Sequence, residues 1–345
     1  MRSQRVSLWD NAKAILMLLV VGGHLLEPLT AEGYPLIYRS IFLFLYTFHM
    51  PAFIFISGLF SKNTLGKGEF PIRKLLPFVV LSFLLKAFYL CIDTIRNKDF
   101  MPNSIFQLSN IAWFLFALFI FYCMMYLLKS LKGKYVLLFA ILFACIAGYN
   151  GRLGDFFAVG RIVVYFPFFA LGYYTDRERL QAFLAKKKVK IAAAAVLVLF
   201  AAAVIVFANP LYTFRPLLTG RNPYQELGNT LYYWGGLLRL VYYGVSTAVM
   251  LAVLALIPRR AVKLFTFIGQ NTLSIYFWHL PLVEALYLLG ILAWVERYRF
   301  APVVILAVAS ASVALCALLS LPPFRTFVNF VRGMFQKHDR EPAKH

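Results

Sequence analysis

Charged residues are scarce in this chain. Only 14% of its 345 residues are Asp, Glu, Lys or Arg, whereas an average soluble domain has about 25%. Hydrophobic residues make up 61% of the chain and form runs of about 18 or more residues along its whole length. This composition excludes an ordinary soluble domain and predicts an all-α integral membrane protein.

Acidic residues are the scarcest of the charged ones. There are 14 of them against 35 basic residues, which gives a formal net charge of +21. In a soluble protein this balance would indicate a nucleic-acid partner. Here the basic residues lie in short loops between aromatic-rich apolar runs, so we expect no nucleic acid and interpret them as signals of membrane orientation.

Cysteine is also rare, and its placement excludes two kinds of site. All four cysteines lie in apolar runs without CxxC spacing, which predicts neither a disulfide framework nor a metal centre. The first apolar run is too long for the core of a signal peptide, and no small-x-small cleavage site follows it. We therefore expect this run to remain in the membrane.

The hydrophobic runs predict about ten transmembrane helices. Of the 35 Lys and Arg residues, 24 fall on the side of the N-terminus, ten fall on the other side, and Lys86 lies inside the third run. This bias places both termini in the cytoplasm. We predict one transmembrane domain over residues 1–324 and a basic, flexible cytoplasmic tail over 325–345. The expected spans are 12–29, 36–60, 72–92, 105–128, 135–149, 159–175, 189–208, 236–257, 268–292 and 301–321.

The first predicted helix carries three ionisable residues on one face. Lys13 and His24 are eleven positions apart, which is within about 20° of a whole number of turns, and Glu27 follows three positions later. Ionisable groups at membrane depth usually mark a site. His24 then acts as a general base oriented by Glu27. The structural alternative is a buried His–Glu pair that ties this helix to another.

Two further histidines share a local pattern. An aromatic residue precedes His49 and His279, and Pro51 and Pro281 follow two positions after them. Proline removes a backbone donor, so each helix should lose a hydrogen bond beside its histidine. The shared pattern is either a trace of an inverted repeat or a coincidence. Each histidine either contacts the substrate or lies in the core with its hydrogen bonds made within the protein.

Polar residues also cluster at the two ends of the predicted helices. Arg73 and Lys74, together with Lys13, would ring the cytoplasmic mouth and bind phosphate, or they serve only as orientation signals. Trp113 and Arg161 open two helices at the outer end, as acceptor contacts or as interface residues.

Three other features have no assigned role. Lys86 and Glu284 lie within predicted spans, where either could be a structural ion-pair partner. The longest outer segment, 209–235, is either a lid over the acceptor or an aromatic belt at the interface.

Several motifs occur in one order along the chain. They are Trp9-Asp10-x-x-Lys13, Gly23-His24, Phe48-His49-Met50-Pro51, Ile56-Ser57-Gly58, Arg73-Lys74 with Pro77, Trp113-Phe114-Leu115, Gly160-Arg161, and Ile268-Gly269-x-Asn271-Thr272-Leu273-Ser274-Ile275-Tyr276 leading to His279. Together they resemble the membrane-bound acyltransferase-3 family, and within it the fucose 4-O-acetylase-like sugar O-acetyltransferases.

The resemblance implies a multi-pass enzyme of the bacterial cytoplasmic membrane. It would move an acetyl or larger acyl group from cytoplasmic acetyl-CoA to a hydroxyl of a cell-envelope sugar, polysaccharide or lipid-linked glycan, without a metal. Direct transfer and an acyl-histidine intermediate both stay open. A transporter or flippase of a polar lipid or sugar is the alternative. The site residues are His24 and Glu27 for catalysis, Lys13, Arg73 and Lys74 for the donor, and His49, Trp113, Arg161 and His279 for the acceptor.

Overall fold

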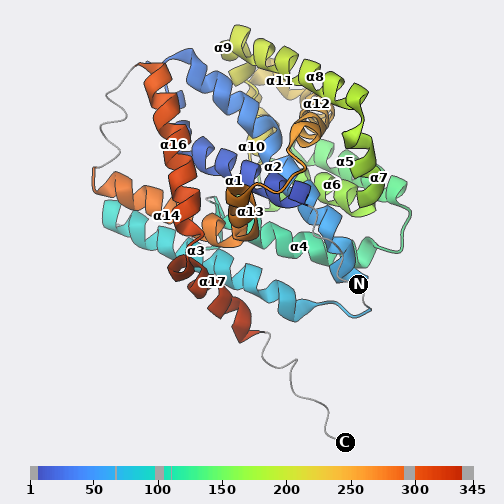
Figure 1. Cartoon of the computed structure of the whole chain (residues 1–345). Helices are drawn as coiled ribbons and strands as arrows, with labels where there is room; N and C mark the ends of the chain where they lie inside the picture. The colour runs from blue at the N-terminus through green and yellow to red at the C-terminus, as the bar shows by residue number, and fades with distance from the viewer. Residues whose placement is uncertain (1–6, 67, 98–104, 110, 291–299, 336–345) are drawn as a thin grey trace, which may run out of the picture.

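The computed structural model describes residues 7–66, 68–97, 105–109, 111–290 and 300–335. Within these ranges every named element is a helix, and one isolated bridge pairs Gln107 with Phe156. The all-α prediction is therefore confirmed (Figure 1). The elements are α1 Ser7–Leu26, η1 Glu27–Thr30, α2 Leu36–Leu65, α3 Ile72–Asn97, α4 Ala112–Leu128, α5 Gly133–Ala147, α6 Val159–Tyr174, α7 Arg177–Ala185, α8 Lys187–Val206, α9 Ala208–Tyr212, α10 Arg215–Thr219, η3 Tyr224–Leu227, α11 Asn229–Tyr232, α12 Gly235–Leu256, α13 Lys263–Gln270, α14 Thr272–Leu288, α16 Ala301–Leu319 and α17 Pro322–Met334.

Six segments of the described residues are long and apolar enough to cross a bilayer. They are Ser7–Thr30, Leu36–Leu65, Ile72–Ile95, Lys187–Val206, Gly235–Leu256 and Ala301–Leu319. The apolar helices α4, α5 and α6 are shorter than this length. The chain is thus a multi-pass membrane protein, and the ten-span arrangement stays a prediction.

Two predicted spans differ from the helices found. The span predicted to begin at residue 105 becomes α-helical only at Ala112, because the chain before it pairs with the loop at Asp155–Phe157. The amide of Leu108 donates to the carbonyl of Asp155 at 2.8 Å. The span predicted over 268–292 is broken at Asn271 into α13 and α14, and its last two residues lie outside the described ranges.

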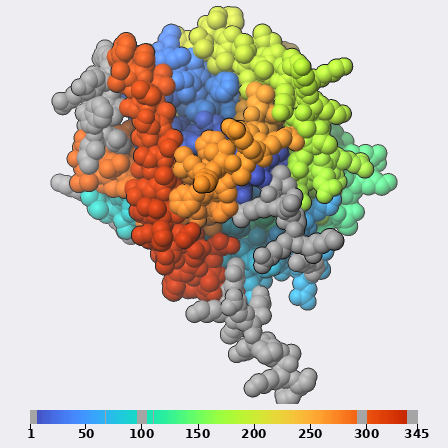
Figure 2. All heavy atoms as spheres, viewed as in Figure 1, coloured from blue at the N-terminus to red at the C-terminus, as the bar shows by residue number. Residues whose placement is uncertain are grey.

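Helix α1 lies in the middle of the molecule (Figure 1). It packs against α2, α13, α14 and α16, and the face in Figure 2 shows α16 and the residues around α13 covering most of it. The Asn11 amide donates to the carbonyls of Pro258 and Arg260, at 2.7 and 2.9 Å, and so fixes the loop between α12 and α13. The ionisable face of α1 is therefore surrounded by protein, which is where such groups are tolerated in a membrane.

Helices α2 and α6 touch through two glycines. A Cβ added at Gly58 would lie 2.1 Å from the carbonyl oxygen of Phe169, and one added at Gly172 would lie 2.1 Å from that of Phe55. Small residues let the backbones of membrane helices approach this closely. The crossing positions the His49 region of α2 against the α6 segment that begins beside Arg161.

We expect Gly172→Ala to destabilise the protein by about 1–3 kcal/mol, because its methyl group would overpack the α2–α6 contact. Gly244→Ala is the matched control, since Gly244 is also within a helix and has no atom within 4 Å of its added Cβ. Thermal unfolding in detergent measures both. Equal midpoints for the two variants would show that the α2–α6 contact relaxes without cost.

The two prolines beside the histidines do not end their helices. Helix α2 continues through Pro51 and α14 through Pro281. The carbonyl of Thr47, which Pro51 deprives of its helical donor, accepts a hydrogen bond from the Ser246 hydroxyl of α12 at 2.7 Å. The lost helical bond thus becomes a contact between α2 and α12.

The segment expected to be a flexible tail from residue 325 is helical as far as Met334. Its apolar residues recur at helical spacing, so α17 is amphipathic and packs against α14 and α3. Rings of Phe324 and Phe327 contact the indole of Trp278, with centroids 6.0 and 5.5 Å apart. Residues 336–345 lie outside the described part of the chain.

Candidate active site

One face of α1 lines two neighbouring cavities. Lys13 and Met17 line a cavity of about 290 Å³, named here the Lys13 cavity, and Val20 and His24 line one of about 570 Å³, the His24 cavity. The spacing of four, three and four residues keeps these side chains on one stripe of the helix. Met50 of α2 and Tyr276 of α14 line both cavities, so the two spaces adjoin. Lys13 and His24 therefore do share one face, as predicted.

His24 and Glu27 stand next to each other at the end of α1. The distance from His24 Nδ1 to Glu27 Oε2 is 3.8 Å, an ion-pair separation that applies when the ring is protonated. The His24 side chain also lines the His24 cavity, where a ligand would reach it. A Cβ added at the preceding Gly23 would lie 3.5 Å from the Tyr46 ring, which is an ordinary van der Waals distance.

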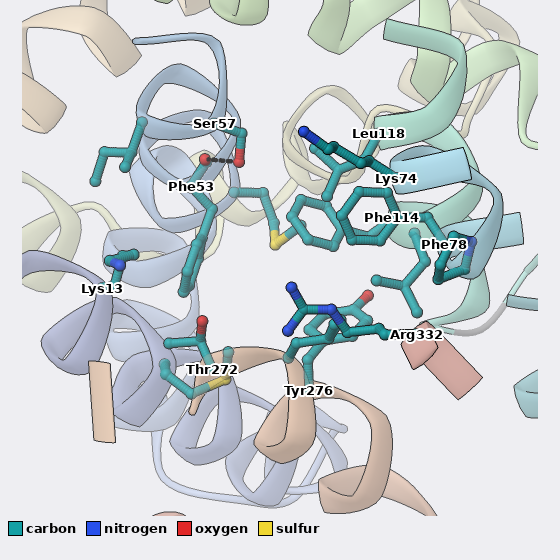
Figure 3. Close-up of a pocket in the computed structure, with 16 residues that line it drawn as sticks. Lys13, Phe53, Ser57, Lys74, Phe78, Phe114, Leu118, Thr272, Tyr276 and Arg332 are labelled. Carbon is teal, nitrogen blue, oxygen red and sulfur yellow. Dashed lines mark hydrogen bonds between the residues drawn. The ribbon is translucent and has the colours of Figure 1, made fainter. Parts of the chain in front are cut away.

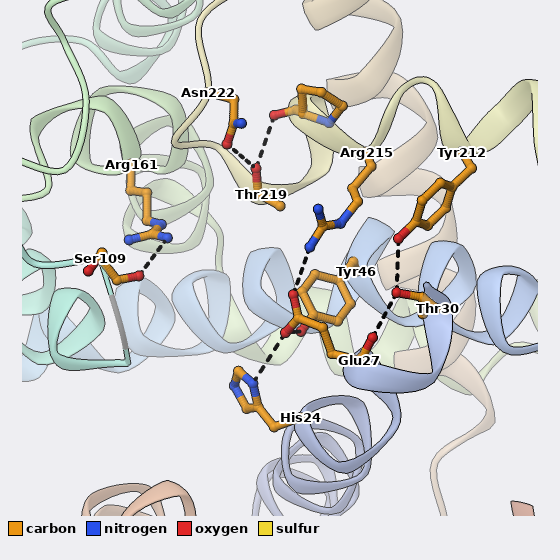
Figure 4. Close-up of polar contacts among 11 residues, drawn as sticks. His24, Glu27, Thr30, Tyr46, Ser109, Arg161, Tyr212, Arg215, Thr219 and Asn222 are labelled. Carbon is orange, nitrogen blue, oxygen red and sulfur yellow. Dashed lines mark hydrogen bonds and ion pairs between the residues drawn. The ribbon is translucent and has the colours of Figure 1, made fainter. Parts of the chain in front are cut away.

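Tyr46 and Arg215, neither of which was predicted as a site residue, hold Glu27 in place. The Tyr46 hydroxyl donates to Oε2 at 2.9 Å and Arg215 Nη2 donates to Oε1 at 2.8 Å (Figure 4). Arg215 begins α10, in the long segment predicted to lie outside, and its guanidinium also lies 5.3 Å from the Phe42 ring centroid. A carboxylate fixed at both oxygens can hold the neighbouring imidazole in one orientation.

His279 lies beside His24, and their ring centroids are 5.5 Å apart. Its Nδ1 is 2.8 Å from the carbonyl oxygen of Tyr276. Since a carbonyl only accepts hydrogen bonds, Nδ1 carries the proton and Nε2 is an acceptor. Nε2 is buried and has no hydrogen-bond partner among the described residues. His279 therefore presents an acceptor atom next to the candidate base.

His49 has the same tautomer as His279. It donates from Nδ1 to the carbonyl of Leu45 at 2.6 Å, and its ring packs edge-on against Tyr46 with centroids 4.8 Å apart. It lines the His24 cavity. The structure thus brings the three predicted histidines to one region, two of them each with its Nδ1–H donated to a carbonyl of its own helix.

Arg161 and Trp113 form another wall of the His24 cavity. The Arg161 guanidinium donates to the carbonyls of Leu108 and Ser109, at 3.0 and 3.1 Å, and lies 3.3 Å from Asp155. Its central carbon is 5.1 Å from the Trp113 ring centroid. The arginine predicted to face a polar acceptor therefore faces protein carbonyls and a carboxylate, which hold it against the indole.

Cationic side chains from three helices surround the Lys13 cavity. Lys13, Lys74 of α3 and Arg332 of α17 approach one open space in Figure 3. Lys13 also pairs with Asp10 at 3.1 Å. Arg73 is exposed on the same turn as Lys74 and is not among the residues that line the cavity. Arg332 belongs to the segment predicted to be a flexible tail, and it reaches the cavity because α17 packs against α14 and α3.

The structure also locates Glu284 and Lys86, the two charged residues to which the sequence assigned no role. Glu284 lines the His24 cavity, whereas Lys86 is buried within α3 with 4% of its surface exposed. Within the described ranges, no group of three His, Cys, Asp or Glu side chains is arranged to hold a metal ion.

Comparisons with known proteins identify a family and a relative for this chain. The chain is similar to the nodulation protein NolL of Mesorhizobium japonicum, with 32% identity over 139 residues, which cover 35% of this chain and 35% of NolL. The matched part therefore spans about a third of that relative's length. No solved structure matches the chain. The family described as an acyltransferase domain, acyltransferase-3, matches residues 7–321. This range contains both cavity-lining ends of α1, and the chain belongs to the acyltransferase-3 family.

Proposed function

We propose that the protein is a membrane O-acyltransferase that moves an acetyl or larger acyl group from acetyl-CoA or a related acyl-CoA to a hydroxyl of a cell-envelope sugar, polysaccharide or lipid-linked glycan. The observation that supports this most is the pair of adjoining cavities along α1. The Lys13 cavity is cationic, as the phosphates of CoA require, and the His24 cavity contains a histidine beside a fixed carboxylate.

We also propose how the protein is oriented in the membrane. The Lys13 end of α1 faces the cytoplasm, where acyl-CoA is present, and the Glu27 end faces outward. The shorter helices α4, α5 and α6, together with α14, complete the ten spans of a bacterial cytoplasmic membrane protein, with both termini inside. The bias of Lys and Arg toward one set of loops supports this orientation.

The two cavities suggest a direct transfer. The phosphates of the donor bind at Lys13, Lys74 and Arg332, with Arg73 adding positive charge at the same mouth. The thioester lies near Met50 and Tyr276, where the cavities adjoin. Neutral His24 removes the proton of the acceptor hydroxyl as its oxygen attacks the acyl carbon. The C–S bond then breaks, and the proton on His24 passes to the CoA thiolate, which leaves as the thiol.

The direct test is acyl transfer by the purified protein in liposomes. We expect label from [acetyl-¹⁴C]acetyl-CoA to appear on envelope glycan. Mass spectrometry of envelope glycans from cells with and without the gene would identify the modified sugar. Movement of substrate across the membrane without acylation would instead establish the transporter alternative.

We expect Lys74→Ala and Arg332→Ala each to raise the Michaelis constant for acyl-CoA about tenfold. Each variant removes one charge-assisted contact to the donor, worth roughly 1.5 kcal/mol. Lys62→Ala is the control, because Lys62 is an exposed cation near the end of α2 that does not line the cavity. Donor titrations at saturating acceptor measure the effect. A raised acceptor constant with an unchanged donor constant would place the sugar at this mouth.

A further inference from the structure

A polar cluster at one end of the His24 cavity has no part in the transfer step. Thr219, Asn222 and Glu226 all line the cavity. Thr219 is the last residue of α10, and the other two lie between α10 and α11. The Thr219 hydroxyl donates to Asn222 Oδ1 at 3.1 Å, and Asn222 Nδ2 donates to Glu226 Oε2 at 2.8 Å. Figure 4 shows Thr219 and Asn222 on the same side as Arg215, with His24 on the other side. The cluster therefore stands across the cavity from the candidate base.

The backbone of this segment is shaped to bring the cluster to the cavity. Gly220 has a φ of +65°, and a Cβ added there would lie 2.7 Å from the Tyr165 ring. Only glycine adopts this conformation at such close range without strain. The Tyr165 hydroxyl donates to the carbonyl of Leu218 at 2.7 Å, which ties the turn to α6. The turn that carries the cluster thus packs against Tyr165 and is hydrogen-bonded to it.

Tyr165 and Trp113 together form an aromatic wall of the His24 cavity. The Tyr165 ring stacks on Trp113 with centroids 5.3 Å apart and an interplanar angle of 23°, and both rings line the His24 cavity. A sugar ring has apolar C–H faces and a rim of hydroxyls. Aromatic rings bury the first, while amide and carboxylate groups hydrogen-bond the second.

The positive and negative side chains that line the His24 cavity are equal in number. Arg161 and Arg221 both pair with Asp155, and Arg215 pairs with Glu27. The cavity is lined by three arginines and three glutamates. An anionic ligand would have to compete with these carboxylates for the arginines and would meet Glu226 and Glu284 as like charges. An uncharged ligand meets neither obstacle.

We propose that Thr219, Asn222 and Glu226, together with the Trp113–Tyr165 wall, form an acceptor subsite for an uncharged sugar ring. This inference rests on the proposed function and specifies its acceptor. Asn222 and Glu226 hydrogen-bond hydroxyls of the ring. The subsite holds the sugar so that another hydroxyl points toward His24.

The test compares Asn222→Ala and Glu226→Gln with Gln225→Ala. Gln225 is the matched control, since it precedes Glu226 on the same turn and its amide donates away from the cavity, to the carbonyl of Tyr149. The probes are methyl glycosides of neutral hexoses and of hexuronates. We expect both subsite variants to raise the Michaelis constant for neutral glycosides about tenfold. Asn222→Ala loses one or two neutral hydrogen bonds, and Glu226→Gln loses the charge that strengthens a hydrogen bond to a sugar hydroxyl. The Michaelis constant for the acyl-CoA donor should stay unchanged, because neither residue lines the Lys13 cavity.

Saturation-transfer NMR of the same glycosides with detergent-solubilised protein provides a readout that needs no turnover. We expect neutral glycosides to bind wild type and Gln225→Ala equally, and Asn222→Ala more weakly. Hexuronates that bind as tightly, or equal losses in Asn222→Ala and Gln225→Ala, would overturn the subsite. If neutral glycosides bind as expected while wild type transfers no acyl group, the proposed function fails and the subsite stands.

Discussion

His24→Ala is expected to lower kcat for acyl transfer by about 10²–10⁴-fold, the range that a positioned general base contributes. The variant removes the only predicted base that faces both Glu27 and the open cavity. His279 lies next to it, but its Nδ1 is already donated to its own helix. His279 belongs to a different helix, α14. Among the described residues, its Nε2 has no hydrogen-bond partner, and so no carboxylate orients it.

The variant should still insert and fold, since the His24 side chain is partly exposed and Glu27 keeps its hydrogen bonds from Tyr46 and Arg215. Ser312→Ala is the matched control, because Ser312 Oγ packs against Gly22 and its hydroxyl bonds only its own helix, at Val308. Turnover and thermal midpoints of the two purified variants distinguish a catalytic role of His24 from a structural one. Near wild-type turnover by His24→Ala would remove the catalytic assignment, and a lowered midpoint would show a structural role.

The part of the site that follows from helical periodicity was predictable from the sequence. Lys13, His24 and Glu27 belong to one helix and its immediate end, so a rise of about 1.5 Å and a turn of about 100° per residue suffice to align them. The general location of the helices was predictable for the same reason, since long apolar runs leave a backbone in lipid few alternatives.

The contacts that complete the site were not predictable, because they join distant parts of the chain. Arg215 is 188 positions from Glu27, and nothing local to Arg215 distinguishes it from other arginines in the outer segments. Arg332 reaches the Lys13 cavity only because α17 packs back onto α14 and α3. The predicted span begins seven residues before Ala112, but there the amide of Leu108 donates to the carbonyl of Asp155 and the carbonyl of Phe106 accepts from the amide of Phe157.

We expect Glu27→Gln and Arg215→Ala each to lower kcat by about 10–100-fold, with smaller effects on either Michaelis constant. Glu27 stabilises the imidazolium that forms during transfer, and a neutral amide cannot. Arg215 acts through Glu27, whose Oε1 it fixes, so it is a positioning residue. A charge-assisted contact of this kind is worth roughly 1.5–3 kcal/mol.

A double-mutant cycle separates this role from mere support of the outer segment. If Arg215 acts through Glu27, then adding Arg215→Ala to Glu27→Gln should cost little more, and the two residues should show a coupling energy of about 0.5–3 kcal/mol. Arg39→Ala is the control, because Arg39 holds the same segment through Asn209 at 3.0 Å and contacts the Tyr212 ring without touching Glu27. Its effect should add to that of Glu27→Gln. Arg215→Lys should recover part of the rate, since it keeps the charge and loses only the fixed geometry of the guanidinium. Full additivity of Arg215→Ala and Glu27→Gln would show instead that Arg215 contacts the acceptor independently of the carboxylate.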